Sequence, residues 1–392
     1  MRADGSHNTI LIYGGVFTQN SAVTGNGGMA SLAASSRLVL LGPATVSRGI
    51  AASGAGVHAK LGSQIDLTHA VFRDGESGGT VFLSWGPGGV GGAICLLDNS
   101  SLLASNSTFL NNVATSDGGA LYQRDGSMIL EEVQIVGNVA GGKGGGIALV
   151  QGTLTASNLS VDSNVAGEDG GGISLTVSAA PCVSTLLDSR VSNNTCGGDG
   201  GGIFLVGANL LASRSSLEEN LADRNGGGIS LESSIIVLRN STRVVHNACN
   251  GIEGGGASLG FGSTLIANSN SSFEGNFAVI YGGGIGSRNS FIETVNVSLE
   301  HNVAGFAGGA INVQVFSDMS RGEHTHSNAA PLEFVQMIVL VKSRVRHNLV
   351  LAGPGGGIMS DLIILSKQGA TIKLINSLVQ GNVAEYGGGI AC

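Results

Sequence analysis

Residues 161–175 read VDSNVAGEDGGGISL, and this stretch contains the two short sequence boxes that decide the fold. The first box, from Val161 to Asn164, is an apolar residue, two variable residues and an asparagine. The second box, from Gly170 to Ile173, is a run of glycines followed by an apolar residue. Because both boxes recur along the chain, we interpret the sequence as an internal repeat before considering anything else.

The two boxes recur in a fixed phase. Copies of the glycine box, Gly-Gly-(Gly or Ala)-apolar, end at Ile94, Leu121, Ile147, Ile173, Ile203, Ile229, Ala257, Ile285, Ile311, Ile358 and Ile390. The asparagine column consists of Asn112, Asn138, Asn164, Asn194, Asn220, Asn247, Asn276, Asn302, Asn348 and Asn382. In seven of the ten copies the asparagine precedes the end of the glycine box by nine residues. This phase locking predicts a stack of equivalent coils.

Each coil opens on a segment with a period of two residues. In 147–149 (Ile-Ala-Leu) and 173–175 (Ile-Ser-Leu) the outer residues are apolar and the middle residue varies between copies. Such alternation predicts a strand with one buried face, and we expect the middle residue to face solvent. Short strands in coils of this length can pair only with the coils above and below. The sequence therefore predicts an all-β, right-handed, single-stranded parallel β-helix, a β-solenoid of about 12 to 14 coils.

The asparagine and glycine columns are predicted to be architecture. Asparagine at a corner between strands tolerates left-handed backbone geometry, and stacked copies can pass amide hydrogen bonds from coil to coil. Glycine allows a second turn with positive φ and close approach of the backbone. Any function is therefore expected on the variable residues between these columns.

The paired boxes also carry a family resemblance. FLNN at 109–112 followed by GGAL at 118–121 resembles the repeat of the chlamydial polymorphic outer-membrane proteins. That resemblance implies an autotransporter adhesin passenger with a pectin-lyase-like β-helix. It is clear over residues 91–392, which we expect to form regular coils, and degenerate over residues 1–90. The first residues lack a signal-peptide layout and the last strand stops within a coil, so we expect the native chain to be longer.

Composition restricts the function further. The 392 residues include 66 glycines, 42% are hydrophobic and the formal net charge is −8. Apolar content this high argues against disorder. The absence of a basic run argues against nucleic acid as a partner. No uninterrupted apolar run of about 18 residues occurs, so no membrane-spanning segment is expected in this chain.

One column of acidic residues precedes the glycine box, and it supplies the weak catalytic candidates Asp169 and Asp199. Its acidic members are Asp117, Asp169, Asp199 and Glu253, interrupted by Lys143 and Asn225. Copies on adjacent coils would lie about 5 Å apart, a spacing that suits catalysis by two carboxylates. Aspartate before two glycines is also what an exposed turn prefers. Both interpretations remain open at this stage.

The remaining candidates are a loop, a cysteine pair and a set of sequons. The interval of 47 residues between Ile311 and Ile358 indicates an inserted loop at about 316–336, which holds His324 and His326, weak candidates for metal binding. Cys182 and Cys196 share one enlarged coil and form the candidate disulfide. Asn106, Asn158, Asn270 and Asn296 occupy one outward phase of the repeat and are either glycosylation sites or an unmodified polar column.

These observations favour a non-enzymatic surface or secreted scaffold for adhesion and multivalent binding. The expected partner is a surface protein or a glycan, the expected location is extracellular or at the cell surface, and no cofactor or metal is expected. The alternative is a polysaccharide-active, pectin-lyase-like enzyme, a lyase or a hydrolase. Several carboxylates together with an arginine or lysine in one groove would favour that alternative.

Overall fold

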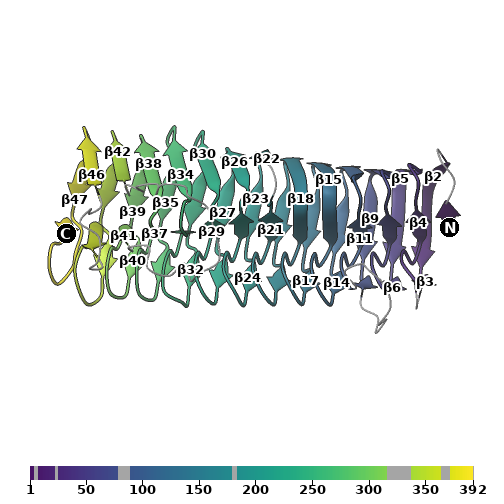
Figure 1. The fold of residues 1–392 in the computed structure, drawn as a ribbon, viewed down its shortest axis with the longest axis horizontal. Coiled ribbons are helices and arrows are strands. Elements are labelled where there is room, and N and C mark those ends of the chain that lie inside the picture. Colours follow the sequence, from purple (N-terminus) through teal and green to yellow (C-terminus); the bar gives the residue numbers. More distant parts are fainter. Residues whose placement is uncertain are drawn as a thin grey trace, which may run out of the picture.

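The computed structural model describes residues 1–3, 8–22, 25–77, 89–178, 183–315, 337–362 and 371–391. In these residues the chain winds into an elongated rod, with strands stacked along the long axis and the two termini at opposite ends (Figure 1). No helix in the described part of the chain is long and apolar enough to cross a membrane.

A coil contains up to four strands, and equivalent strands stack in four columns. The first column contains β1 (Arg2–Ala3), β4 (Ala30–Leu32), β7 (Val57–Ala59), β11 (Ile94–Leu96), β15 (Leu121–Glu131), β18 (Ile147–Ser157), β21 (Ile173–Thr176), β25 (Ile203–Val206), β29 (Ile229–Glu232), β33 (Ala257–Leu259), β37 (Ile285–Arg288), β41 (Ile311–Val315), β45 (Ile358–Leu362) and β48 (Ile390–Ala391). The second column contains β2 (Thr9–Thr18), β5 (Arg37–Ser47), β8 (Gln64–Thr68), β12 (Ser100–Ser105), the second halves of β15 and β18, β22 (Val183–Leu187), β26 (Asn209–Ser213), β30 (Ile235–Arg239), β34 (Thr264–Asn268), β38 (Phe291–Val295), β42 (Met337–Val341) and β46 (Thr371–Ile375).

The other two columns are built from shorter strands. The third column contains the ends of β2 and β5, then β9 (Ala70–Arg73), β13 (Thr108–Leu110), β16 (Gln134–Val136), β19 (Ser160–Asp162), β23 (Arg190–Ser192), β27 (Ser216–Glu218), β31 (Arg243–Val245), β35 (Ser272–Glu274), β39 (Ser298–Glu300), β43 (Arg344–Arg346) and β47 (Leu378–Gln380). The fourth contains β3 (Ser21–Ala22), β6 (Ile50–Ala51), β10 (Glu76–Ser77), β14 (Val113–Ala114), β17 (Val139–Ala140), β20 (Val165–Ala166), β24 (Thr195–Cys196), β28 (Leu221–Ala222), β32 (Ala248–Cys249), β36 (Phe277–Ala278), β40 (Val303–Ala304) and β44 (Leu349–Val350).

Every strand pair in these columns is parallel, and each strand pairs with its equivalent in the next coil. The first three columns join into one sheet because β15 and β18 run from the first column to the second, and β2 and β5 run from the second column to the third. The fourth column is a separate sheet of 12 strands, one for each coil it crosses. This topology confirms the predicted parallel β-helix and is consistent with the right-handed form.

The interior of the rod is a continuous apolar stack. Ile147, Leu149, Leu154 and Val161 in one coil are all at most 1% exposed, and they contact equivalent residues of the coils on either side. Aromatic rings are rare in the stack, and Phe72 packs on Phe109 with 5.4 Å between ring centroids. Because every strand contributes alternate residues to this core, burial follows the period of two that the sequence predicts.

The asparagine column forms a hydrogen-bonded ladder inside the rod. Asn194 is fully buried, and its Nδ2 donates to Asn220 Oδ1 at 3.0 Å and to the carbonyl of Val161 at 3.0 Å. The same pattern links successive members from Asn112 to Asn382. The ladder satisfies buried amides that would each otherwise be left without a partner.

The middle residue of the first strand is buried, which overturns the expectation that it faces solvent. Ser174 and Phe204 are 2% and 3% exposed. The cause is the glycine turn of the same coil, which folds back over the strand. Gly170 has φ +71, and a Cβ on it would lie 3.0 Å from the Cβ of Ser174. The middle residue thus points out of the core and lies beneath its own turn.

The small residues of the fourth column form a second buried stack at the corner. Cys196 and Cys249 alternate there with Ala166, Ala222 and Ala278, and both thiols are free and fully buried. Burial raises the pKa of each thiol to about 12. These cysteines therefore serve as small apolar residues.

Candidate functional site

The turn before each glycine box carries the acidic column, and its first role is structural. Asp117 Oδ1 accepts a hydrogen bond from the backbone N–H of Lys143 at 2.8 Å. Asp169 Oδ1 accepts one from the N–H of Asp199 at 2.9 Å, and Asp199 Oδ1 accepts one from the N–H of Asn225 at 2.9 Å. Each carboxylate therefore ties its turn to the equivalent turn of the next coil.

Asp169 also lies between two cations, Lys143 from the preceding coil and Arg224 from two coils further along the rod. Its carboxylate is 2.8 Å from Lys143 Nζ and 3.2 Å from Arg224 Nη2, and the residue is 6% exposed. Burial opposes the charge on Asp169, but the Asp199 N–H and Lys143 outweigh it and hold the pKa of Asp169 below its usual value. Burial also opposes the charge on Lys143, yet its hydrogen bond to Asp169 and the surrounding acids raise the pKa of Lys143. Asp169 is thus ionised at neutral pH.

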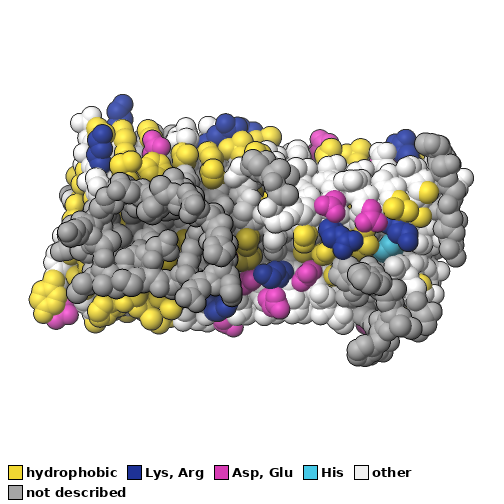
Figure 2. Space-filling view, viewed as in Figure 1, with side chains coloured by type: hydrophobic (Ala, Val, Ile, Leu, Met, Phe, Trp, Pro, Cys, Tyr) yellow, Lys and Arg dark blue, Asp and Glu magenta, His cyan; other side chains and the backbone are white. Residues whose placement is uncertain are grey.

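Arg224 connects the two sequence candidates and reaches solvent. Its Nη2 atom lies 3.2 Å from Asp169 Oδ1 and 3.0 Å from Asp199 Oδ2, while its side chain is 61% exposed. One guanidinium therefore bridges carboxylates from two coils and still presents N–H groups to solvent. Figure 2 shows Lys and Arg side chains beside Asp and Glu on the near face of the rod.

Glu232, at the end of β29, is the functional candidate that sequence reasoning missed. Partial burial raises the pKa of Glu232, and the nearby charges of Asp199 and Asp169 raise it further. Its position is the outward one of a strand whose equivalents in the three preceding coils are the neutral residues Val150, Thr176 and Val206. The signal available in the sequence was a glutamate at a repeat position that is uncharged in the three preceding coils.

Together these residues outline a strip along the rod. One column of equivalent positions begins with Arg124 and ends with Glu232. Between these two charged residues it contains the partly buried, uncharged side chains of Val150, Thr176 and Val206. The charged row, which we define as Lys143, Asp169, Asp199 and Arg224, follows the turns that precede the same strands. The side chain of Lys143 extends toward β25, and its Nζ lies 5.0 Å from the centroid of the Phe204 ring.

A second polar group lies deeper, one coil beyond Arg224 and Glu232. Glu253 is 1% exposed, and its Oε1 accepts a hydrogen bond from Ser258 Oγ at 3.2 Å and lies 2.9 Å from Arg288 Nε. A Cβ on Gly286 would lie 2.7 Å from the Cβ of Glu253, so glycine at that position makes room for the acid. Burial raises the pKa of Glu253 despite the neighbouring Arg288. Sequence reasoning did not separate Glu253 from the rest of the acidic column.

The other sequence candidates stay apart from the charged row. Asn106, Asn158, Asn270 and Asn296 are all exposed and sit at the turns between the second and third strands. Cys182, His324 and His326 lie outside the described residues, as does the loop expected at 316–336. Cys196 is a free thiol, so the structure does not show the candidate disulfide. Within the described ranges no group of three or more metal-ligating side chains is found.

The charge on Asp169 leads to a prediction about pH. Because its pKa is lowered on folding, Asp169 stabilises the folded chain at neutral pH, and this contribution is lost as pH falls through the folded-state pKa. We expect Asp169→Asn to lower the free energy of unfolding at pH 7 by about 2 kcal/mol. The difference in free energy of unfolding between the two proteins should shrink once pH is below about 4. Urea unfolding of both proteins at pH 7 and pH 3 measures the change.

The matched control for that measurement is Asp223→Asn. Asp223 is an exposed aspartate of the same stretch of chain, and it accepts a hydrogen bond from Asn250 Nδ2. We expect the control to change stability by less than about 0.5 kcal/mol at either pH. An Asp169→Asn deficit of the same size at pH 3 and pH 7 would show that the ion pairs with Lys143 and Arg224 are not its cause.

Comparison with known proteins identifies the repeat and the fold. Residues 106–124 match the sequence profile of the Chlamydia polymorphic membrane protein repeat, which confirms the resemblance predicted from FLNN and GGAL. A search of the curated proteins finds no match. The crystal structure of the periplasmic alginate epimerase AlgG is 12% identical, with a TM-score of 0.51 over 95% of this chain and 77% of that chain.

Two further solved structures are similar. A double-substitution variant of the same epimerase is 11% identical, with a TM-score of 0.51 over 88% of this chain and 78% of that chain. The A-module of the Azotobacter vinelandii mannuronan C-5 epimerase AlgE4 is 12% identical, with a TM-score of 0.38 over 98% of this chain and 91% of that chain. At these identities the similarity to AlgG establishes a shared β-helix fold.

These findings correct the expectation of a non-enzymatic adhesive scaffold. The solved structures that share the fold are described as alginate epimerases and not as adhesive scaffolds. The charged row brings two carboxylates, Asp169 and Asp199, together with Lys143 and Arg224, which are the residue types that the polysaccharide-active alternative requires. The chain is a parallel β-helix whose residues 106–124 match the Chlamydia polymorphic membrane protein repeat.

Proposed function

We propose that this chain acts on an acidic polysaccharide by proton transfer at a sugar carbon, with the charged row and Glu232 as its active surface. One observation carries the proposal: the exposed guanidinium of Arg224, 3.2 Å from Asp169 and 3.0 Å from Asp199, lies on the turn that precedes β29, the strand that ends at Glu232, a carboxyl of raised pKa. A cation beside a carboxyl of raised pKa is the pairing that proton abstraction next to a carboxylate requires.

The chemistry assigns a separate role to each group. Arg224 binds the carboxylate of a sugar residue and neutralises negative charge as the adjacent carbon loses its proton. Glu232, in its ionised form, accepts that proton, and a raised pKa makes it the stronger base. Return of a proton from water to the opposite face of the carbon gives an epimer. Alternatively, the bond to the glycosidic oxygen breaks, the oxygen leaves with the bonding electrons and takes a proton from water, and an unsaturated lyase product remains.

Hydrolysis is less well supported by the same residues. A glycoside hydrolase needs one protonated carboxylic acid and one carboxylate. Asp169 has a lowered pKa and already forms ion pairs with Lys143 and Arg224, so it is a poor proton donor. We therefore assign Asp169 and Asp199 to holding Arg224 in place rather than to acid catalysis.

The proposal includes a location and a partner. The match to a membrane-protein repeat and the description of AlgG as periplasmic both support a site outside the cytoplasm, either extracellular or within the cell envelope. An acidic polysaccharide is the proposed partner, and it falls within the glycan class expected from the sequence.

Glu232→Gln tests the proposal directly. The substitution keeps the shape of the side chain and removes the base, so we expect activity to fall about a hundredfold. Purified protein would be assayed on polymannuronate, polyguluronate and polygalacturonate. Ultraviolet absorbance detects unsaturated ends, and exchange of carbon-bound hydrogen with deuterated water detects epimerisation.

The control is Glu219→Gln, at an exposed glutamate on a different corner of the coil. We expect this variant to keep full activity. Activity of the unsubstituted protein should decline at acidic pH as Glu232 gains a proton, with the midpoint above the usual value for glutamate. The proposal fails if no acidic polymer is converted, or if Glu232→Gln is as active as the control.

A further inference from the structure

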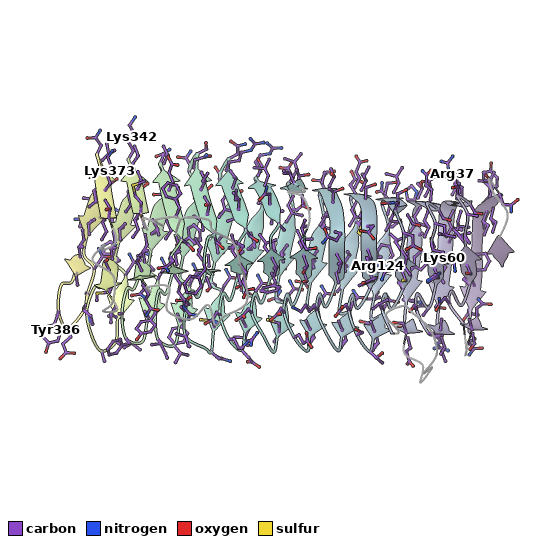
Figure 3. The ribbon with its side chains drawn as sticks, viewed as in Figure 1. Arg37, Lys60, Arg124, Lys342, Lys373 and Tyr386 are labelled. Carbon is purple, nitrogen blue, oxygen red and sulfur yellow. The ribbon has the colours of Figure 1, made fainter. Side chains whose placement is uncertain are left out.

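A small surface pocket lies on the turns between the second and third strands, away from the charged row. Its volume is about 190 Å³, and its lining includes Asn270, Asn296, Ser298, Lys342 and Arg344. These residues come from three consecutive coils, because β35 pairs with β39 and β39 pairs with β43. In Figure 3, Lys342 projects outward from the C-terminal part of the rod.

The two cations of the pocket have no acidic partner among the described residues. Glu300, on β39, is already engaged by Arg346, whose Nη2 lies 2.9 Å from Glu300 Oε1. Ser298 Oγ also donates to the same Glu300 oxygen. Those contacts, with Arg346 foremost among the charges, hold the pKa of Glu300 below its usual value despite partial burial. Lys342 and Arg344 therefore keep their charges available to a ligand.

The amide side of the pocket adds hydrogen-bond donors. Asn296 Nδ2 donates to Asn270 Oδ1 at 2.6 Å, and this bond fixes the two side chains relative to each other. The Asn270 oxygen is thereby occupied, while its own amide N–H groups have no partner in the described part of the chain. Two cations and an amide donor make a site for oxygen atoms that carry negative charge.

The size of the pocket limits what it can hold. Its volume is below the roughly 300 Å³ at which pockets for drug-sized molecules begin. We propose that it is an accessory site for one carboxylate of an acidic polysaccharide, held while the rest of the polymer extends along the rod. This inference shares its polymer class with the proposed function, but none of its residues belongs to the charged row.

The test measures binding with the catalytic step removed. In a Glu232→Gln background, calorimetric titration would use a short mannuronate oligosaccharide, a neutral glucose oligosaccharide of equal length, and sodium sulfate. We expect the combined Lys342→Gln and Arg344→Gln substitutions to weaken mannuronate binding about tenfold, equivalent to about 1.4 kcal/mol. The neutral oligosaccharide should bind weakly or not at all to either protein.

The control substitution is Lys373→Gln. Lys373 is an exposed lysine on β46, the next coil, and it does not line the pocket (Figure 3). We expect this change to alter affinity less than twofold, because a rim charge outside the site contributes little. Thermal melting of all variants would establish that these exposed substitutions leave the fold intact.

Two results would overturn the inference. One is unchanged mannuronate affinity in the double variant. The other is loss of sulfate binding in the double variant without measurable mannuronate binding to the parent, which would make the pocket a site for small inorganic oxyanions. If Glu232→Gln retains activity while the double variant still loses affinity, the proposed function fails and the accessory site stands.

Discussion

Asn220→Ala is expected to lower the free energy of unfolding by about 4 kcal/mol, the largest stability loss we predict. Asn220 is 1% exposed. Its Oδ1 accepts hydrogen bonds from the backbone and the amide of Asn194, both at 3.0 Å. Its Nδ2 donates to the carbonyl of Val191 at 3.0 Å and to Asn247 Oδ1 at 2.9 Å. Alanine removes all four bonds and leaves their partners buried.

Urea unfolding followed by circular dichroism measures this loss, with Asn250→Ala as the control. Asn250 is exposed and donates only to Asp223 Oδ1, so its replacement should cost less than about 0.5 kcal/mol. Because a solenoid can unfold in segments, we expect hydrogen exchange to locate the loss of stability in the coils that adjoin Asn220. Equal midpoints for the two variants would contradict a structural role for the ladder.

Gly201→Ala is expected to destabilise the rod by about 3 kcal/mol or more. A Cβ on Gly201 would lie 2.4 Å from the carbonyl oxygen of Gly227 and 2.5 Å from the carbonyl carbon of Leu221. Both obstacles are backbone atoms of the next coil, so neither can rotate away. The coils would have to separate, and the parallel pairing of β25 with β29 would weaken.

Gly262→Ala measures the cost of a left-handed backbone alone, without the steric overlap between coils that Gly201→Ala introduces. Gly262 has φ +72, and nothing lies within 4 Å of a Cβ built on it. Its replacement should therefore cost only the strain of a left-handed backbone, about 1 kcal/mol. Thermal or urea unfolding of the two variants provides the comparison. A Gly262 variant as unstable as the Gly201 variant would mean that conformation, and not contact between coils, explains the glycine box.

The fold was predictable because its interactions repeat. Asn194 and Asn220 occupy the same phase in successive coils, so a local pattern of residues also specifies the contact between coils. The buried middle residue was mispredicted for the opposite reason. Ser174 alternates with apolar neighbours and does point away from the core, but the turn at Gly170 covers it. Alternation reports the direction of a side chain and carries no information about what lies above it.

The candidate site was only half predictable. Asp169 and Asp199 were found because they share a phase of the repeat. Arg224 was not, because it occupies a turn position that carries other residue types elsewhere, and its contact with Asp169 spans 55 residues. Glu232 was missed because its raised pKa depends on charges that approach it only after the coils stack.

The sequence by itself determined the parallel β-helix, its coil length, and the asparagine and glycine columns, since these follow from nearest-neighbour contacts that recur at a fixed interval. Only the tertiary structure decided which variable residues act together. Stacking brings Lys143, Asp169, Asp199 and Arg224 from different coils into one charged row and sets Glu232 beside it. It also separates Lys342 and Arg344 from any described carboxylate partner. Such groupings depend on distances across the stack, which residue spacing alone does not specify.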